Sequence, residues 1–156
     1  MDLRTAVVVI VHVALFAVGC RLVAIDIRSH RLPDRIVLPT LAVLVVLVAV
    51  DAAVAGESGT TVRSLLGMLI LGGFYAVLRA LSRQGIGGGD VKLAAVIGLT
   101  LAWHGWQALA VGAASAFVIG ALYAIGLMVL RRADGATRIA FGPWMILGAL
   151  LGIIAR

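Results

Sequence analysis

Residues 107–130 read QALAVGAASAFVIGALYAIGLMVL and contain no charged side chain. A helix needs about 20 apolar residues to cross the hydrocarbon core of a bilayer, and this stretch is long enough. Similar stretches recur along the chain of 156 residues, of which 63% are hydrophobic and only 13% charged. A soluble protein of this composition would leave too much apolar surface in water. The sequence therefore predicts an all-α membrane protein.

Charge clusters and Gly or Pro residues divide the chain into six expected helices, at residues 4–26, 36–55, 63–82, 91–103, 107–130 and 140–155. The fourth has about 13 residues, roughly 20 Å of helix, which is too short to cross a bilayer of about 30 Å. Gly142 and Pro143 mark a break near the start of the sixth. We expect the first apolar stretch to be a retained helix rather than a signal peptide, and residues 1–156 to form one polytopic domain.

Basic residues cluster in the first, third and fifth connections, whereas the other two contain only Arg63. The clusters are Arg28, Arg31 and Arg35; Arg79, Arg83 and Lys92; and Arg131, Arg132 and Arg138. Under the positive-inside rule these connections face the cytoplasm and both termini lie outside. We therefore expect a multi-pass protein of the cell inner membrane. The net charge of +6 does not follow one helix face, so the lipid bilayer rather than nucleic acid is the expected partner.

Asp26 and Asp90 stand out among the acidic residues, because the predicted topology places both on the cytoplasmic side. Asp90 follows the glycine-rich segment Gly85–Gly89 and opens the short fourth helix. Irregular backbone at membrane depth is tolerated only inside protein or beside a wet cavity, so this segment is expected to submerge Asp90. The alternatives are a flexible hairpin capped by Asp90 and a surface ion pair between Asp26 and Arg28 or Arg31.

The remaining acids have simpler explanations. Asp34 follows Pro33 at an expected N-cap position. Asp51 lies about 24 Å along the second helix from Arg35, near the outer interface, where a functional role stays open. The other three, Asp2, Glu57 and Asp134, fall in a terminus, a loop and a turn.

Two neighbouring carboxylates can share one proton, because mutual repulsion and partial burial raise the pKa of one of them. The ionised carboxylate then activates a water while the protonated one polarises a peptide carbonyl, which hydrolyses a peptide without metal or cofactor. The residues that other kinds of site require are missing. The chain has no His-Glu-x-x-His motif for a zinc peptidase and no Gly-x-Ser-x-Gly motif for a serine hydrolase. Cys20 is its single cysteine, so one chain can form neither a disulfide nor a paired-cysteine metal site.

Three segments resemble the type IV prepilin peptidases. Gly87–Asp90 fits Gly-x-Gly-Asp, Asp26–Asp34 is similar to the segment that carries the family's first catalytic aspartate, and Ala140–Trp144 is similar to its Phe-Gly-Pro-aromatic element. The resemblance spans nearly the whole chain. It implies an aspartic endopeptidase with Asp26 and Asp90 as catalytic residues. The implied substrate is a prepilin-like membrane protein of a type IV pilus or secretion system, cut after a glycine at the end of a short basic leader at the cytoplasmic face.

The chain also departs from the family. Longer members carry two Cys-x-x-Cys pairs in a domain that accompanies N-methylation, so we expect no methyltransferase activity here, as in the short members that serve tight-adherence pili. Asp34 replaces the usual Asn. Lys92 either reaches the cytoplasmic interface or stabilises the charge of Asp90, and Gly87, Gly89, Gly142 and Pro143 are expected to shape the site. Two other functions stay open: a small ion-coupled transporter or channel subunit, and a non-catalytic pilus assembly factor.

Overall fold

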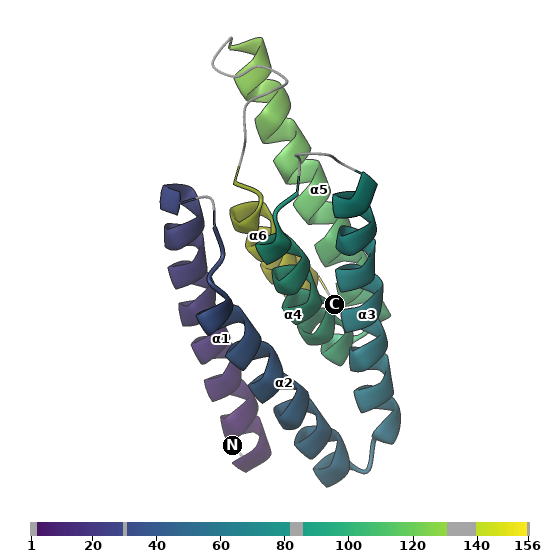
Figure 1. Ribbon diagram of the computed structural model, residues 1–156. Helices are drawn as coiled ribbons and strands as arrows, with labels where there is room; N and C mark the ends of the chain where they lie inside the picture. The colour runs from purple at the N-terminus through teal and green to yellow at the C-terminus, as the bar shows by residue number, and fades with distance from the viewer. Residues whose placement is uncertain (1–2, 30, 82–85, 131–139, 156) are drawn as a thin grey trace.

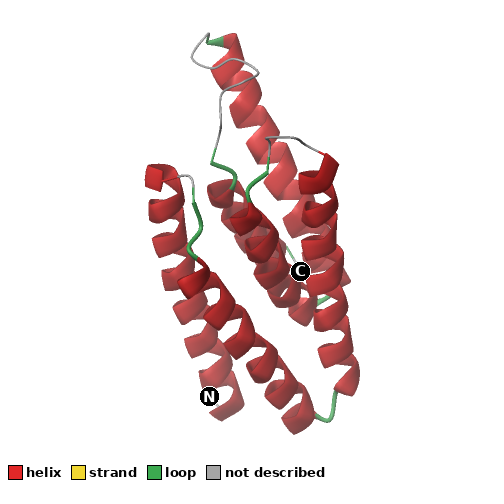
Figure 2. Cartoon of the chain, in the orientation of Figure 1, coloured by secondary structure: helices red, strands yellow, loops and turns green. Residues whose placement is uncertain are grey.

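Six helices follow one another in a computed structural model that describes residues 3–29, 31–81, 86–130 and 140–155 (Figures 1 and 2). They are α1 (Leu3–Ser29), α2 (Asp34–Ala55), α3 (Ser58–Leu81), α4 (Gly88–His104), α5 (Trp106–Val129) and α6 (Gly142–Ile154). No strand occurs in these described ranges. The prediction of six helices and an all-α membrane protein is confirmed. Gly85, Arg83 and the charged residues at 131–138 lie outside the described residues.

Four of the helices, α1, α2, α3 and α5, are long and apolar enough to cross a membrane. The other two are shorter, with 17 residues in α4 and 13 in α6. Successive helices alternate in direction, so the connections that follow α1, α3 and α5 lie at one end of the bundle (Figure 1). We call this end, which carries Asp26 and Asp90, the site end, and the end with the α2–α3 turn the distal end.

The short helix α4 is the centre of the bundle. It packs against α2, α3, α5 and α6, and nearly every residue from Leu93 to Trp103 is buried. Close packing depends on small residues, because a Cβ added to Gly67 of α3 would lie 2.6 Å from the Gly98 carbonyl oxygen. Since protein surrounds α4 on several sides, a helix too short to span the bilayer is still shielded from lipid.

The structure corrects the predicted starts of two helices. Helix α4 begins at Gly88 rather than 91, so the last glycines of the segment are helical and α4 is longer than predicted. Helix α3 begins at Ser58 rather than 63, and Arg63, inside the helix, donates to the carbonyl oxygens of Ala102 (2.7 Å) and Trp103 (3.0 Å). These hydrogen bonds satisfy carbonyl groups at the C-terminus of α4 that have no partner within the helix.

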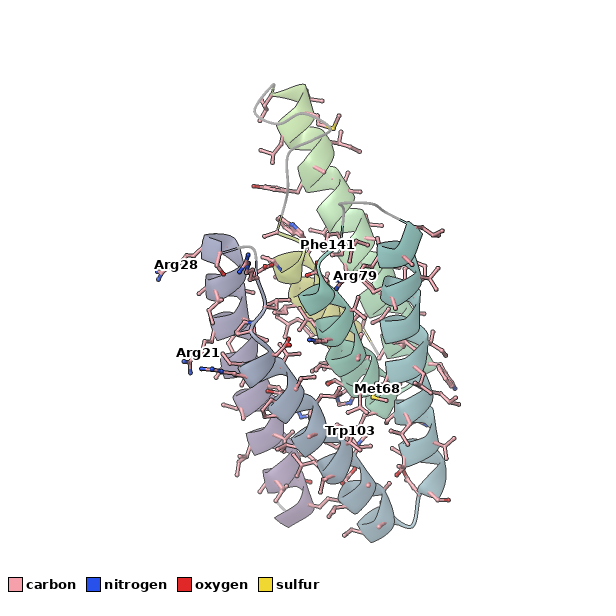
Figure 3. The ribbon with its side chains drawn as sticks, viewed as in Figure 1. Arg21, Arg28, Met68, Arg79, Trp103 and Phe141 are labelled. Carbon is pink, nitrogen blue, oxygen red and sulfur yellow. The ribbon has the colours of Figure 1, made fainter. Side chains whose placement is uncertain are left out.

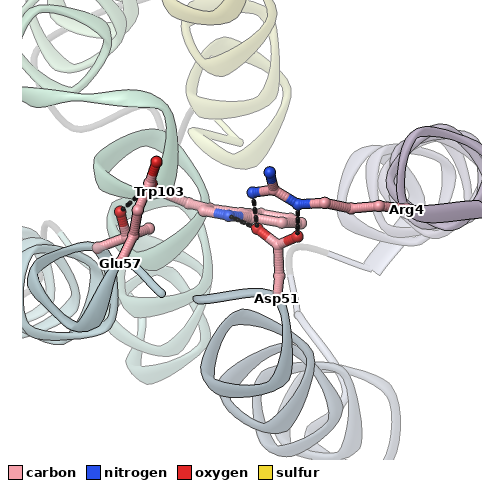
Figure 4. Close-up of polar contacts among 5 residues, drawn as sticks. Arg4, Asp51, Glu57 and Trp103 are labelled. Carbon is pink, nitrogen blue, oxygen red and sulfur yellow. Dashed lines mark hydrogen bonds and ion pairs between the residues drawn. The ribbon is translucent and has the colours of Figure 1, made fainter. Parts of the chain in front are cut away.

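Polar side chains tie the helices together at the distal end. Arg4 of α1 forms an ion pair with Asp51 of α2 at 2.7 Å, and the Trp103 indole N–H donates to the same carboxylate at 3.1 Å (Figure 4). His12 and His104 lie with their Nε2 atoms 2.7 Å apart. Asp51 therefore lies at the end of α2 opposite the site end, as its spacing predicted, and links three helices there.

Candidate active site

Asp26 lies near the C-terminus of α1 and is only 4% exposed. Its Oδ2 accepts a hydrogen bond of 3.1 Å from the backbone N–H of Gly142, the first residue of α6. The first N–H groups of a helix have no partner within the helix, and the helix dipole favours negative charge at that end. A buried carboxylate is thus matched to a helix N-terminus. Arg28 projects away from the bundle (Figure 3), whereas Asp26 is buried, so Asp26 is not the surface acid that the alternative of a surface ion pair assumed.

Asp90 lies in the first turn of α4 and is half-buried. Its Oδ2 accepts a hydrogen bond of 3.0 Å from the Gly87 backbone N–H, so its side chain stabilises the start of the helix. Asp90 therefore caps α4, as one of the two alternatives for this residue expected. Asp90 lies outside the four candidate spans, and burial raises the pKa of its carboxyl. The Gly87 N–H opposes that shift, and the charge of Asp26 adds to it.

The structure brings Asp26 and Asp90 together at the site end, from helices separated by more than sixty residues of sequence. The negative charge of Asp26 acts on the Asp90 carboxyl, and the charge of Asp90 acts in turn on the Tyr75 hydroxyl of α3. Burial and like charge are the two conditions under which a pair of carboxylates holds one proton.

Three aromatic rings fix the backbone that holds Asp26. Tyr75, Phe117 and Phe141 come from α3, α5 and the residue preceding α6, and their centroids lie 5.6 to 6.1 Å apart. Such spacing is typical of attractive aromatic contacts. Phe141 directly precedes Gly142, so the cluster positions the N–H that contacts Asp26. The sequence did not predict a site role for Tyr75, because within an apolar helix its residue type resembles ordinary core.

The site-shaping glycines lie where a side chain does not fit. A Cβ on Gly142 would lie 2.6 Å from Asp26 Oδ2, and a Cβ on Gly89 would lie 2.6 Å from the Cβ of Leu32. Gly87 supplies the N–H for Asp90, as described above. Pro143 occupies the first turn of α6, where its missing N–H costs no helical bond, so the residue pair opens the helix rather than breaking it.

Lys92 and Asp34 form an ion pair of 2.6 Å between α4 and the start of α2. Asp34 is the first residue of α2, and the N-cap is Pro33, so the expected side-chain cap is wrong by one position. The carboxylate of Asp34 is instead used to hold Lys92. Both side chains are partly exposed, and an exposed pair contributes about 1 kcal/mol at most. Its main effect is to join the segment after Asp26 to the helix that carries Asp90.

Two carboxylates of unequal burial, each accepting a backbone N–H at the start of a helix, can activate a water and polarise a carbonyl. Among the described residues no three His, Cys, Asp or Glu side chains gather in a metal-binding group.

A family model described as the type IV leader peptidase family matches residues 13–125, a range that contains both aspartates. Several curated relatives carry the name prepilin leader peptidase/N-methyltransferase. The protein from Escherichia coli K12 is 36% identical over 154 residues, covering 92% of this chain and 64% of that protein. The protein from Aeromonas salmonicida A449 is 32% identical over 137 residues, covering 83% and 44%. This chain thus spans about half the length of the curated relatives it matches. No solved structure matches it.

Proposed function

Because the chain belongs to the type IV leader peptidase family, we propose that it is an aspartic endopeptidase that removes the leader of a prepilin-like membrane protein. The proposed cut follows a glycine at the end of a short basic leader. The observation that carries the proposal is the pairing of Asp26 with Asp90, in which a buried charge acts on a second, half-buried carboxyl. Relatives named as prepilin leader peptidases support the same reaction.

The two carboxylates are proposed to have different roles. Asp26 accepts from the N-terminus of α6, which favours its ionised form as the base that takes a proton from the attacking water. Asp90, with its raised pKa, is the protonated member that donates to the carbonyl oxygen. Water oxygen bonds to the carbonyl carbon, and the C–N bond then breaks. The proton held by Asp26 passes to the leaving amine nitrogen, and the carbonyl re-forms as Asp90 recovers its proton.

The proposed reaction takes place at the cytoplasmic face of the inner membrane. Arg28, Arg31, Arg79 and Lys92 all belong to the site end, and basic residues accumulate on the cytoplasmic side of membrane proteins. A basic leader would be cytoplasmic before cleavage, so enzyme and leader would meet on the same side. Because the leader and the site end are both basic, their like charges repel, and the leader is proposed to be recognised by residues other than these cations.

A processing assay with purified protein and a prepilin-like substrate tests the assignment. We expect Asp26→Asn and Asp90→Asn each to abolish detectable cleavage, because each removes a carboxylate with a distinct role. Asp34→Asn and Asp51→Asn are the matched controls, since they change the same residue type in ion pairs outside the carboxylate pair. Full cleavage by either of the first two variants would overturn the assignment.

We propose cleavage without methylation for these 156 residues. The resemblance ties methylation to paired cysteines, and the sequence contains only Cys20. The mass of the new amino terminus, measured after reaction with a methyl donor present, distinguishes the two outcomes. A gain of one methyl group would contradict this part of the proposal.

A further inference from the structure

A polar pocket of about 440 Å³ opens at the distal end, where α1, the α2–α3 turn and the C-terminus of α4 meet. We call it the distal pocket. Two cations and two carboxylates line it, and Trp103 forms part of its wall (Figure 4). The charged residues are Arg4, Asp51, Glu57 and Arg63. Ligand pockets in proteins occupy about 300–1,000 Å³, so the distal pocket has room for a small molecule with several polar groups.

The distal pocket lies at the depth of a lipid headgroup layer. Arg4 precedes Asp26 by 22 residues of the same helix, which is about 33 Å at the helical rise. The hydrocarbon core of a bilayer is about 30 Å thick. When the site end lies at one surface of the membrane, the distal pocket therefore lies at the other. Trp103 fits this placement, since tryptophan is enriched where hydrocarbon meets water.

An apolar groove begins at the distal pocket and leads along α1 toward the middle of the bundle. We call it the α1 groove. Val8, Val9 and His104 line both the pocket and the groove, so the two are continuous. Val13 and Phe16 continue the groove and are 64% and 54% exposed, which places them toward lipid. A polar pocket at the membrane surface that continues into an apolar groove matches the shape of a phospholipid headgroup followed by an acyl chain.

Arg63 and Glu57 have hydrogen-bonding atoms left over after their contacts within the protein. Arg63 donates through Nε and Nη2 to carbonyl groups at the end of α4, and Glu57 Oε2 accepts from the Thr60 hydroxyl at 3.2 Å. Within the described part of the chain, Arg63 Nη1 and Glu57 Oε1 form no hydrogen bond. Arg4 and Asp51, in contrast, neutralise each other in their ion pair. One guanidinium and one carboxylate thus remain to meet opposite charges on a ligand.

We propose that the distal pocket binds the headgroup of phosphatidylethanolamine and that the α1 groove holds one of its acyl chains. The phosphate pairs with Arg63, whose fork of N–H donors suits phosphate oxygens, and the primary ammonium donates to Glu57. The balance of charge favours this lipid over others. Phosphatidylcholine has no N–H to donate, and phosphatidylglycerol carries a negative phosphate without the cation that complements Glu57.

The bound lipid joins α1 to the rest of the bundle. Helix α1 is the least buried of the four candidate spans, and its contacts at this end include the ion pair of Arg4 and the bond between His12 and His104. A lipid between Val9 of α1 and Arg63 of α3 fills the space beside these contacts. The inference does not depend on the proposed peptidase activity, because neither the residues nor the ligand are those of the aspartate pair.

Native mass spectrometry of the purified protein in detergent tests the proposal. Phosphatidylethanolamine, phosphatidylcholine and phosphatidylglycerol with identical oleoyl chains are added at equal concentration, and the lipid that the protein retains is quantified. We expect phosphatidylethanolamine to bind about tenfold more tightly than either of the others, since it alone complements both Arg63 and Glu57.

Two variants separate the headgroup from the chain. Glu57→Gln removes the charge that binds ammonium, so the preference for phosphatidylethanolamine over phosphatidylcholine should fall to nearly one. Its control is Asp34→Asn, which neutralises a partly exposed carboxylate at the site end. Val9→Trp places a large ring where pocket and groove join and should weaken binding of all three lipids about tenfold. Ile10→Trp is the matched control, because Ile10 is 66% exposed and lines neither the pocket nor the groove.

Thermal unfolding gives a second readout on the same proteins. Phosphatidylethanolamine should raise the Tm of the parent and of both controls more than phosphatidylcholine does, because a ligand that binds the folded state stabilises it. For Glu57→Gln the two lipids should raise the Tm equally.

Several results would overturn the inference. Equal retention of the three lipids by the parent would indicate unspecific lipid around the bundle, and a preference for phosphatidylglycerol would indicate a site for anions. Competition by glycerophosphoethanolamine, which lacks acyl chains, at the same concentration as the lipid would indicate a water-soluble ligand. A parent-like preference in Glu57→Gln, or equal losses in the control variants, would refute the assigned roles of Glu57 and Val9.

Discussion

Residue 142 shows how one missing side chain determines the geometry of a carboxylate. The Gly142 N–H donates to Asp26 Oδ2 at 3.1 Å, and the position that a Cβ would occupy lies 2.6 Å from the same oxygen. Any L side chain at this position therefore displaces the carboxylate that the backbone holds. Asp26 is buried, so its alternatives are limited by the neighbouring helices.

We therefore expect Gly142→Ala to reduce kcat by about a hundredfold, because a displacement of about 1 Å at a reacting group costs about that much. The steady-state cleavage rate measures it. Gly126→Ala in α5 is the control, since no atom lies within 4 Å of the Cβ that it adds. A Gly142→Ala protein with the parent rate would show that Asp26 has no positional role.

The unequal environments of the two carboxylates predict a pH dependence. The pKa of Asp90 is raised by burial and by the charge of Asp26, and in the proposed mechanism its protonated form donates to the carbonyl oxygen. Activity should therefore fall as pH rises through this raised pKa. The pH profile of kcat/KM measures this alkaline limb. Asp34→Asn, which changes a partly exposed carboxylate, should leave the profile in place; a profile without an alkaline limb would contradict the role of Asp90.

Helix packing explains which elements the sequence predicted well. Six helices were predictable because each is an apolar run bounded by charges or by Gly and Pro residues, and α5 differs from its predicted bounds by one residue at each end. The start of α4 was not predictable from local preference. Gly88 and Gly89 are poor helix formers, but the segment packs closely on Leu32 and the Asp90 carboxylate holds the Gly87 N–H. The backbone N–H that donates to Asp26 belongs to Gly142, 116 residues further along the sequence. No local sequence pattern encodes a contact between residues so far apart in the chain.

The α3–α4 contact predicts a stability effect. A Cβ on Gly98 would collide with the Gly67 backbone, so Gly98→Val forces the two helices apart and should lower the free energy of unfolding by about 3 kcal/mol. Gly73→Ala in α3 is the matched control, because nothing lies within 4 Å of its added Cβ, and a helical Gly→Ala change should be neutral or slightly stabilising. Unfolding in detergent micelles, followed by circular dichroism, measures both. Equal stability of the two variants would refute close packing at Gly98.

For the whole molecule, the distribution of charge is the basis of the proposed orientation in the membrane. The site end carries Arg28, Arg31, Arg79 and Lys92, whereas at the distal end Arg63 binds the carbonyl groups at the end of α4 and Arg4 binds Asp51. Arg63 and Arg4 are thus engaged within the protein at the distal end, as Lys92 is by Asp34 at the site end. On the positive-inside rule, the proposed orientation has the site end in the cytoplasm and both termini outside.

Cysteine labelling in a Cys20→Ala background tests this orientation. Glu57→Cys places a thiol in the exposed α2–α3 turn at the distal end, and Ser29→Cys places one at the site end, where Ser29 is also exposed. A maleimide that does not cross the inner membrane should label Glu57→Cys in intact cells, and Ser29→Cys only after that membrane is permeabilised. The reverse pattern would put the aspartate pair outside the cell membrane, where a cytoplasmic leader never reaches it. The proposed substrate would then be excluded even if both carboxylates proved essential, because cleavage requires the leader and the site on the same side.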